Sequence, residues 1–337
     1  MPKLKLSFIS AFNERVDPLM KDTVQAEGIE IVPTYSHPSE TFWRQLKFQE
    51  YEVGEMSMSS YLIARERGFD IIALPVFPSR RLFHSELSYN TDSGIKQPSD
   101  LVGKRIGVGE YQQTAALWQR GILEHDFGVS QYKVHWYMER TEELSHGGIT
   151  GFTPPQGISF QRISPDKSMA SMLVSGELDA AAINNPWKNT ESVIARSHRI
   201  PGSSGDWSKV KVLFPDRIAE GARFFKKWGF LPVNHAYTIR GDIYKKYPWV
   251  AFNLYTGFVK AKEHFNAKLV DSIPSGLFFG REYLAMTQGL FGNDPYPYGV
   301  KANRKMLETL IDFSHEQGLT SKKMKVEELF AVSTLDL

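Results

Sequence analysis

Short runs of apolar residues alternate with stretches of helical periodicity along the first part of the chain. This alternation is typical of βαβ units, whose strands pair in a largely parallel sheet. Ser39, a residue type that caps helices well, is predicted to begin the second helix. The strands predicted in this series span residues 4–10, 29–35, 51–56 and 69–77, with helices at 18–26, 39–49 and 59–67 between them.

A second series of the same kind begins near residue 104, after a turn-rich segment at 98–103. Its strands are predicted at 104–108, 133–137 and 179–183, its helices at 113–127 and 166–175, and a Gly- and Pro-rich loop at 147–159. The rest of the chain is predicted to be mainly helical, with one returning strand at 234–240. We therefore expect one lobe formed by residues 1–100 and 205–337, with residues 101–204 inserted as the other lobe.

The predicted fold class is α/β, with two lobes and a ligand cleft between them. In open α/β sheets, ligands bind beyond the carboxyl ends of strands, where loops and helix N-termini converge. The segments that directly follow predicted strands are therefore the best places to search for function. These segments are residues 10–13, 55–60, 77–85, 109–114 and 184–187.

Composition narrows the class of protein. The 337 residues include 40 Lys and Arg against 38 Asp and Glu, a net charge of 40 − 38 = +2, which indicates neither a nucleic acid nor a membrane surface as partner. The absence of cysteine excludes a disulfide scaffold, a thiolate nucleophile and cysteine-ligated metals. No apolar run approaches the ~18 residues of a membrane span, and the N-terminal residues lack the apolar region of a secretory signal. We therefore expect a cytoplasmic protein.

The loop that leaves the fourth predicted strand carries three candidate residues close together: Arg80, Arg81 and His84. Guanidinium groups suit a carboxylate ligand, and an imidazole suits proton transfer near neutral pH. The alternative is a solvated basic turn, with His84 packed at the start of a strand.

The segment 107–114 is predicted to form a strand end, a glycine-containing turn and a helix start. Its glycines would let the backbone approach a ligand, and the free N–H groups of the helix start would favour an anion. The segment matches neither a P-loop nor a dinucleotide-binding fingerprint, and a plain turn before a structural helix is the alternative. The candidate substrate-binding residues here are Tyr111, Gln112, Gln113 and Thr114.

Two other segments place polar side chains after strands. Glu55 could hold a histidine or accept the proton of a phenol, and the Ser57 hydroxyl could bind a ligand oxygen. The alternative for this segment is a cluster that caps the next helix. Asn184 and Asn185 would either present their amides to a ligand or form a turn.

His235 is the second candidate for proton transfer, because it lies on the strand that returns to the first lobe and could face the cleft. The alternative is a histidine satisfied within the core. No His-x-x-x-His or His-x-His pair is present, so the sequence indicates no local metal site. The motifs of serine acyl-enzymes are also missing. If neither histidine donates the proton, the next candidates for the proton donor are Glu110, Tyr111 and a metal-bound water.

Several strings, each weak alone, are specific in combination: Phe42-Trp43-Arg44, Glu55-Met56-Ser57, residues 59–65 and 75–80, Gly109-Glu110-Tyr111-Gln112, Thr114-Ala115-Ala116 and Arg120-Gly121-Ile122-Leu123. Together they resemble the 4,5-dihydroxyphthalate decarboxylase family. The similarity is dense from about residue 4 to residue 130 and looser but collinear to the C-terminus. It implies a periplasmic-binding-protein type II-like fold, which chorismate dehydratase also resembles. Because Arg81 stands where the family is expected to vary, the resemblance favours Arg80 as the substrate clamp.

The resemblance implies a carboxy-lyase that converts 4,5-dihydroxyphthalate to 3,4-dihydroxybenzoate (protocatechuate) and carbon dioxide. Each carboxylate of this substrate is para to a hydroxyl, so a phenolate pushes charge into the ring, and protonation of the carboxylate-bearing carbon then permits loss of carbon dioxide without an organic cofactor. We expect Arg80 and Arg81, with the start of the 113–127 helix, to bind a carboxylate. His84 and His235 would act as the acid and the phenol-polarising partner, and Glu55 would orient an imidazole or accept the phenolic proton.

Two other functions stay open at this point. A solute-binding protein of an ABC-type transporter, for an aromatic or thiamine-precursor-like ligand, shares the fold. A divalent-metal decarboxylase would let the catechol chelate an ion held by dispersed Glu and His residues, since folding can bring distant ligands together. Apart from such a metal we expect no cofactor, and exposed aromatic residues at 278–280 and 291–298 indicate a homo-oligomer.

Overall fold

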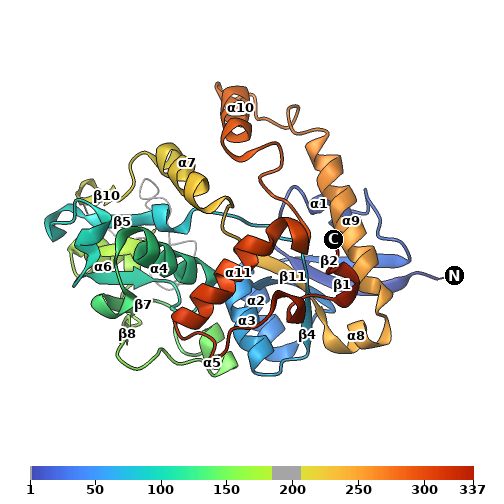
Figure 1. The fold of residues 1–337 in the computed structure, drawn as a ribbon, viewed down its shortest axis with the longest axis horizontal. Coiled ribbons are helices and arrows are strands. Elements are labelled where there is room, and N and C mark those ends of the chain that lie inside the picture. Colours follow the sequence, from blue (N-terminus) through green and yellow to red (C-terminus); the bar gives the residue numbers. More distant parts are fainter. Residues whose placement is uncertain (1, 184–205) are drawn as a thin grey trace. The chain divides into compact units, whose positions relative to one another are not determined.

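The computed structural model describes residues 2–183 and 206–337, and Figure 1 shows the ribbon coloured along the sequence. The chain divides into two compact units, each with its own sheet. The first unit comprises Met1–Arg81, Phe224–Thr309 and Met324–Leu337. The second unit comprises Leu82–Arg223 and Leu310–Lys323.

The sheet of the first unit is formed by β1 (Leu4–Ser10), β2 (Ile29–Tyr35), β3 (Val53–Ser57), β4 (Ile71–Leu74) and β11 (His235–Arg240). The strand order is β2-β1-β3-β11-β4. β1 pairs in parallel with β2 and β3, whereas β11 runs antiparallel between β3 and β4. The start of β11 therefore lies at the same edge as the carboxyl ends of its neighbours.

The core of the first unit is centred on three fully buried aromatic rings. Tyr237 stacks on Phe258 with ring centroids 4.6 Å apart, and Phe8 meets both rings edge-on at 5.2 and 5.7 Å. This apolar and aromatic burial holds β1, β11 and the helix at Trp249–Asn266 together. The helices of this unit are α1 (Asp17–Met20), α2 (Pro38–Phe48), α3 (Met58–Glu66), α8 (Gly241–Lys246), α9 (Trp249–Asn266) and α10 (Gly280–Phe291).

The sheet of the second unit is formed by β5 (Leu87–Asn90), β6 (Arg105–Val108), β7 (His135–Met138), β8 (Ser159–Arg162), β9 (Ala180–Ala182) and β10 (Val210–Val212). The strand order is β10-β5-β9-β6-β7-β8. β9, β6, β7 and β8 are parallel, and β5 and β10 add an antiparallel edge. Gly107 in β6 serves packing rather than ligand approach, because a Cβ at this position would lie 2.7 Å from Leu178 Cδ1.

The helices of the second unit are α4 (Thr114–Phe127), α5 (His146–Thr150) and α6 (Met169–Ser175). The unit boundaries fall within α7 (Arg217–Trp228) and α11 (Val300–Glu316). Short 3₁₀ helices span Phe83–Glu86, Thr91–Ser93, Pro98–Leu101, Gln131–Lys133, Trp207–Lys209, Val326–Glu328 and Val332–Thr334. None of the helices in the described part of the chain has the length and apolar character needed to cross a membrane.

Most predicted elements are confirmed within a few residues, and the strands predicted at 4–10 and 29–35 are confirmed at both ends. The helix predicted at 18–26 is shorter, because the chain leaves α1 after Met20 and Asp22 adopts a positive φ of 58°. Ser39 is not the cap of α2. The cap is His37, whose Nδ1 accepts the Ser39 N–H at 3.3 Å, and proline occupies the first helical turn.

The unit boundaries differ from the predicted division into 1–100 with 205–337 and 101–204. β5 and β10 pair with each other, and β5 also pairs with β9, so both strands belong to the second sheet. The second unit therefore begins at Leu82 rather than near residue 101, and it comprises Leu82–Arg223 and also Leu310–Lys323. Strands of three or four residues are too short to show the alternation that predicts a strand. The loop predicted at 147–159 likewise begins within a short helix, α5.

Candidate active site

The first unit contains a pocket of about 350 Å³ at the edge of its sheet. Its walls come from the segment after β1, the segment after β4 and the start of β11. This is the edge at which open α/β sheets bind ligands, and the volume suits a small molecule. The lining residues are Ala11, Phe12, Asn13, Arg15, Pro38, Glu55, Pro78, Ser79, Arg80, Arg81, Asn234, His235 and Tyr296.

Glu55 and His235 form a hydrogen-bonded pair in this pocket, with Glu55 Oε1 2.6 Å from His235 Nδ1. Glu55 lies on β3 and His235 begins β11, and the antiparallel register of these strands brings the two side chains together. Oε2 of Glu55 accepts the Ala11 N–H at 3.0 Å. Burial by itself raises the pKa of the Glu55 carboxyl, but His235 and these hydrogen bonds outweigh burial, so the pKa is lowered. The carboxylate is therefore ionised beside the imidazole.

The Glu55 carboxylate also determines which nitrogen of His235 is available for chemistry. A carboxylate that binds Nδ1 accepts a proton from it, so Nε2 becomes the nitrogen that gains or loses the second proton. Nε2 makes no hydrogen bond to any described residue, and the side chain keeps 10% of its surface exposed. Phe42 meets the ring edge-on at 4.7 Å and fixes its plane. The arrangement suits proton transfer at a ligand in the pocket.

A second layer of hydrogen bonds lies behind Glu55. The Ser10 hydroxyl lies 3.3 Å from Glu55 Oε2 and 2.9 Å from the Tyr237 hydroxyl. Burial, followed by the charge of Glu55, raises the pKa of Tyr237 well above its usual value. Tyr237 is therefore neutral, and this layer holds the carboxylate in one orientation.

Arg80 lines the pocket, but most of its hydrogen-bonding capacity is used within the protein. Nη1 donates to the Leu231 carbonyl at 2.8 Å, and Nη2 donates to the Pro297 carbonyl at 2.9 Å and to the Asn303 side chain. All these acceptors are neutral, and burial lowers the pKa of Arg80 to about 10. The guanidinium thus remains charged at neutral pH and ties three chain segments together.

Arg15 is a pocket residue that the sequence did not single out. Its guanidinium carbon lies 3.9 Å from the centre of the Tyr296 ring, and Nη2 donates to the Pro78 carbonyl at 2.8 Å. Its position in the sequence could have indicated it, because Arg15 lies two residues beyond the segment 10–13 that follows the first predicted strand. Arg81, the other predicted clamp, also lines the pocket and is half-buried.

His84, predicted as one of two proton-transfer residues, lies in the second unit, and its side chain has no exposed surface. Its Nε2 is 2.5 Å from Glu220 Oε1, and Arg223 donates to both oxygens of that carboxylate. Burial raises the pKa of Glu220, but His84 and Arg223 outweigh it and lower the pKa to about 2. Phe214 meets the His84 ring edge-on at 5.3 Å. These contacts favour the alternative of a packed histidine just before a strand.

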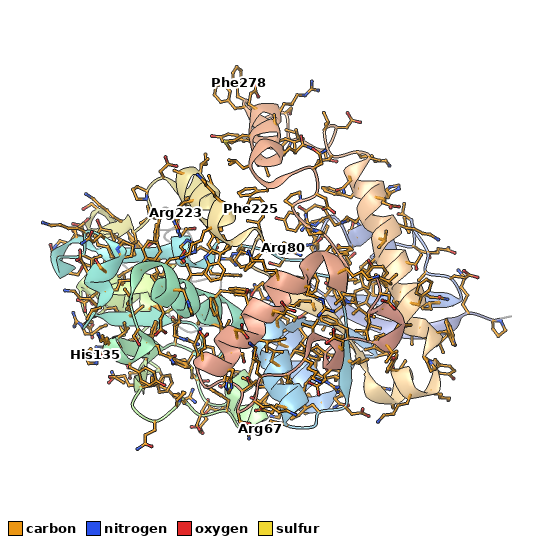
Figure 2. All side chains as sticks on the ribbon, in the orientation of Figure 1. Arg67, Arg80, His135, Arg223, Phe225 and Phe278 are labelled. Carbon is orange, nitrogen blue, oxygen red and sulfur yellow. The ribbon has the colours of Figure 1, made fainter. Side chains whose placement is uncertain are left out.

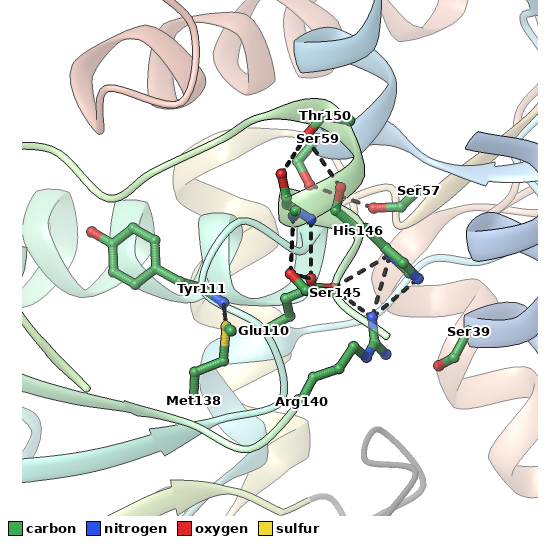
Figure 3. A network of polar contacts seen from close by, with 12 residues as sticks. Ser39, Ser57, Ser59, Glu110, Tyr111, Met138, Arg140, Ser145, His146 and Thr150 are labelled. Carbon is green, nitrogen blue, oxygen red and sulfur yellow. Dashed lines mark hydrogen bonds and ion pairs between the residues drawn. The ribbon is translucent and has the colours of Figure 1, made fainter. Parts of the chain in front are cut away.

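The second unit contains another buried carboxylate–histidine cluster (Figure 3), which follows the carboxyl ends of β6 and β7. Glu110 Oε2 accepts from Arg140 Nη1 at 2.5 Å and lies 3.4 Å from His146 Nδ1. Glu110 Oε1 accepts from the Ser145 hydroxyl at 2.6 Å and from the Gly147 N–H at 3.1 Å. Burial raises the pKa of Glu110, but Arg140 first and then His146 outweigh it and lower the pKa to about 2.

The other predicted residues that the structure describes do not line the pocket. Tyr111 is fully buried in the second unit, where its hydroxyl donates to Gln131 at 2.7 Å and Arg120 lies over its ring. Ser57 ends β3, with its hydroxyl 3.4 Å from that of Ser59. Gln112 hydrogen-bonds to Glu110, Gln113 caps α4 and Thr114 is its first residue. Asn184 and Asn185 lie outside the described residues.

Within the described residues, no group of three or more Asp, Glu or His side chains is arranged to hold a metal ion. Of the residues that line the pocket, Glu55 and His235 are of the types that commonly bind metals. They already bind each other.

Two curated relatives are named 4,5-dihydroxyphthalate decarboxylase. The protein from Comamonas testosteroni is 30% identical over 339 aligned positions, which cover 100% of this chain and 99% of the relative. The protein from Pseudomonas putida is 36% identical over 181 positions, which cover 53% of this chain and 70% of the relative. Residues 10–212 match a family described as the periplasmic substrate-binding protein of a phosphonate ABC transporter.

Two solved structures resemble this fold along nearly the whole chain. The periplasmic aliphatic sulphonate-binding protein of Escherichia coli superposes with a TM-score of 0.51 at 13% identity, covering 98% of this chain and 92% of its own. The alkanesulfonate-binding protein of Xanthomonas axonopodis pv. citri, bound to MOPS, gives 0.51 at 13% identity, covering 99% and 97%. At this identity the likeness shows the fold alone. The predicted periplasmic-binding-protein type II-like α/β fold is confirmed.

Proposed function

This chain belongs to the 4,5-dihydroxyphthalate decarboxylase family and is a carboxy-lyase, and from that premise we propose that its substrate is 4,5-dihydroxyphthalate. The products would be protocatechuate and carbon dioxide. The observation that carries the proposal is the Glu55–His235 pair in a pocket that also contains arginine side chains. A titratable imidazole beside fixed positive charge is what protonation of an electron-rich aromatic dianion requires.

The proposed reaction begins when a phenol of the substrate loses its proton to become a phenolate. Its electrons move through the ring, and the carbon para to it, which bears a carboxylate, takes a proton from the enzyme. The carbon–carbon bond to the carboxylate then breaks, its electron pair restores the aromatic ring and carbon dioxide leaves. The phenol's proton passes to solvent in the first step. The ring is restored as a phenolate, and solvent then returns one proton to this oxygen and one to the enzyme's acid.

In this scheme the proton donor to the ring carbon is His235, acting through Nε2. The Glu55 carboxylate stabilises the imidazolium before transfer and holds the neutral ring in the correct tautomer afterwards. His84 was the other candidate, but its side chain has no exposed surface and its Nε2 lies against Glu220. We therefore assign the acid to His235 and no catalytic step to His84.

The positive charges of the pocket provide the affinity for the substrate. Arg80 contributes a fixed charge at the wall, and Arg81 is the predicted direct partner of a carboxylate. Phe12 and Tyr296 offer aromatic faces against which the substrate ring can pack. Together these groups suit a small aromatic acid and provide little for a long or cationic ligand.

The alternative function is ligand binding without chemistry, and the match of residues 10–212 to a periplasmic substrate-binding family is the observation that favours it. A binding protein needs the cationic pocket but no acid, so His235 would then serve only as a hydrogen-bond donor. The two functions therefore differ in what removal of the imidazole does to turnover.

The decisive experiment is to incubate the purified chain with 4,5-dihydroxyphthalate and to follow carbon dioxide release and protocatechuate by chromatography. The decarboxylase proposal expects stoichiometric formation of both, whereas binding without release supports the alternative. A parallel incubation with a chelator tests the expectation that no metal is needed, since loss of activity that added divalent metal restores would support the metal-dependent route.

We also propose that the protein is a cytoplasmic homo-oligomer. The support for the oligomer is the exposed aromatic segment before α10, where Phe278 and Phe279 are 87% and 57% exposed. Phe278 is labelled in Figure 2. Light scattering of the purified protein measures the oligomeric state, and fractionation of the source cells measures the location.

A further inference from the structure

The arginines of the pocket differ in how much of each guanidinium remains available to a ligand. Both terminal nitrogens of Arg80 (Figure 2) are occupied by main-chain carbonyls and by Asn303, and Arg80 is 6% exposed. A substrate carboxylate could reach it only by displacing contacts that hold the wall together. Arg80 therefore acts as a positioning residue and as a source of positive potential.

Arg15 has the opposite arrangement. Its Nη2 is held by the Pro78 carbonyl at 2.8 Å and its guanidinium plane lies on the Tyr296 ring. Nη1, by contrast, makes no hydrogen bond to any described residue and is not among the buried polar atoms. One nitrogen thus anchors a residue that lines the pocket, while Nη1 keeps exposed surface. A guanidinium immobilised in this way loses little conformational entropy when an anion binds.

The balance of charge in the pocket points in the same direction. Glu55 is the one carboxylate that lines it, and its partner is His235. Within the part of the chain that the structure describes, no carboxylate forms an ion pair with Arg15 or Arg80. Three arginines therefore line the pocket against one carboxylate, and this excess of positive charge favours a ligand that carries more than one negative charge.

We propose that Arg15 is the specificity-determining residue that binds the second carboxylate of the substrate and so selects ortho-dicarboxylates over monocarboxylates. This inference rests on the proposed function, because it concerns the same pocket. It also has chemical meaning for turnover. One carboxylate must leave as carbon dioxide from a site close to His235, whereas the other stays on the product and has to be held still. Arg15 performs the second task.

The test compares the affinities for phthalate and benzoate, which carry two and one carboxylates but lack the hydroxyls needed for reaction. Isothermal titration of the wild-type chain should show phthalate binding about 10- to 100-fold more tightly than benzoate, the range of one additional charge-assisted contact. In Arg15→Gln this ratio should fall towards one. Arg281→Gln, an exposed position on α10 with the same loss of charge, is the matched control and should keep the wild-type ratio.

Two further variants keep the result interpretable. Arg15→Lys preserves the charge without the fork and should give an intermediate ratio, which provides a readout if Arg15→Gln folds poorly. Arg80→Gln should lower the midpoint of unfolding because it abandons buried carbonyls, and its folded fraction should lose less of the preference for phthalate than Arg15→Gln does, because Arg80 acts on the ligand only through its field. Circular dichroism of each variant measures the folded fraction.

A wild-type ratio near one, or an unchanged ratio in Arg15→Gln, would overturn the assignment of Arg15. These results are distinct from a failure of the proposed function. If the wild-type chain releases carbon dioxide from 4,5-dihydroxyphthalate but the affinity ratio is unchanged in Arg15→Gln, the proposed role of Arg15 is wrong and the decarboxylase proposal stands. If the affinity ratio falls towards one in Arg15→Gln but the wild-type chain releases no carbon dioxide, Arg15 is the anion clamp. The proposal that this substrate is decarboxylated is then wrong.

Discussion

Glu55 in the first unit and Glu110 in the second are buried glutamates that each lie beside a histidine, yet their surroundings give them different capacities. Glu55 in the first unit has His235 as its ionisable partner, and that ring lines a pocket. Glu110 in the second unit has its charge balanced by Arg140, with His146 beside the pair. An arginine is always charged, so it fixes the ionisation of its carboxylate, whereas a histidine can deliver its proton and take another.

The comparison shows that a carboxylate–histidine contact is not by itself evidence of catalysis. The Glu110 carboxylate stabilises the start of α5, because it also accepts hydrogen bonds from the Ser145 hydroxyl and the Gly147 N–H. The Glu55 cluster leaves one imidazole nitrogen without a described partner. The difference is which atom remains available to a ligand.

The largest expected effect is on turnover when each histidine is replaced by asparagine. His235→Asn should lower kcat by ~10²–10⁴ with substrate binding retained, because the ring carbon loses its acid. His146→Asn should leave kcat close to that of the wild type. Steady-state kinetics with 4,5-dihydroxyphthalate, together with titration by phthalate, measure both quantities. Equal losses of kcat in the two variants would break the comparison.

The next effect concerns stability, and here the Glu110 cluster should be the more sensitive of the two. Glu110→Gln removes the carboxylate partner of the buried Arg140 and should cost about 3–5 kcal/mol of unfolding free energy. Glu55→Gln should cost less, because its imidazole partner can become neutral, and should instead depress kcat. Chemical denaturation of both variants, with kinetics on the folded protein, makes the measurement. A Glu55→Gln variant that is the less stable of the two would contradict this reasoning.

Protonation of Glu110 should also account for part of the stability that the fold loses at low pH. Its pKa is about 2 in the folded chain, below that of an unfolded glutamate, so the ionised form stabilises the fold. This contribution, about 3 kcal/mol, is complete above about pH 4.5 and is lost as the pH falls towards 2. Unfolding free energies from pH 7 down to 3 should therefore fall less steeply in Glu110→Gln. Parallel curves for the variant and the wild type would show that other groups control acid unfolding.

The smallest effect concerns the hydroxyls that hold each carboxylate. Ser10→Ala removes the 3.3 Å contact to Glu55 and should lower kcat about 2- to 10-fold, the equivalent of one modest hydrogen bond. Ser145→Ala removes both a contact to Glu110 and the cap of α5, so it should cost about 1 kcal/mol of stability. Its kcat should be unchanged. A Ser145→Ala variant with reduced kcat in a fully folded protein would bring the second cluster into the reaction.

Much of the fold follows from local pattern. β1 and β2 alternate apolar and polar residues over most of their length, which is the pattern of a half-buried strand, so both are visible in the sequence. Glu55 and His235 could also be singled out, because polar residues at strand ends stand out against apolar neighbours. The short strands β5 and β10 carry too few residues to show a pattern, and they changed the unit boundary from residue 100 to Leu82.

The partners of each charged side chain were decided only by the tertiary structure. Glu55 meets His235, 180 positions later in the sequence, because β11 returns antiparallel beside β3, and no local pattern encodes that register. Arg80 looked like a clamp in the sequence, but carbonyls from Leu231 and Pro297 occupy it. Arg15 looked unremarkable until the Tyr296 ring and the Pro78 carbonyl were placed against it. Residue type determines what a side chain can bind, whereas long-range packing determines which of its donors are still available.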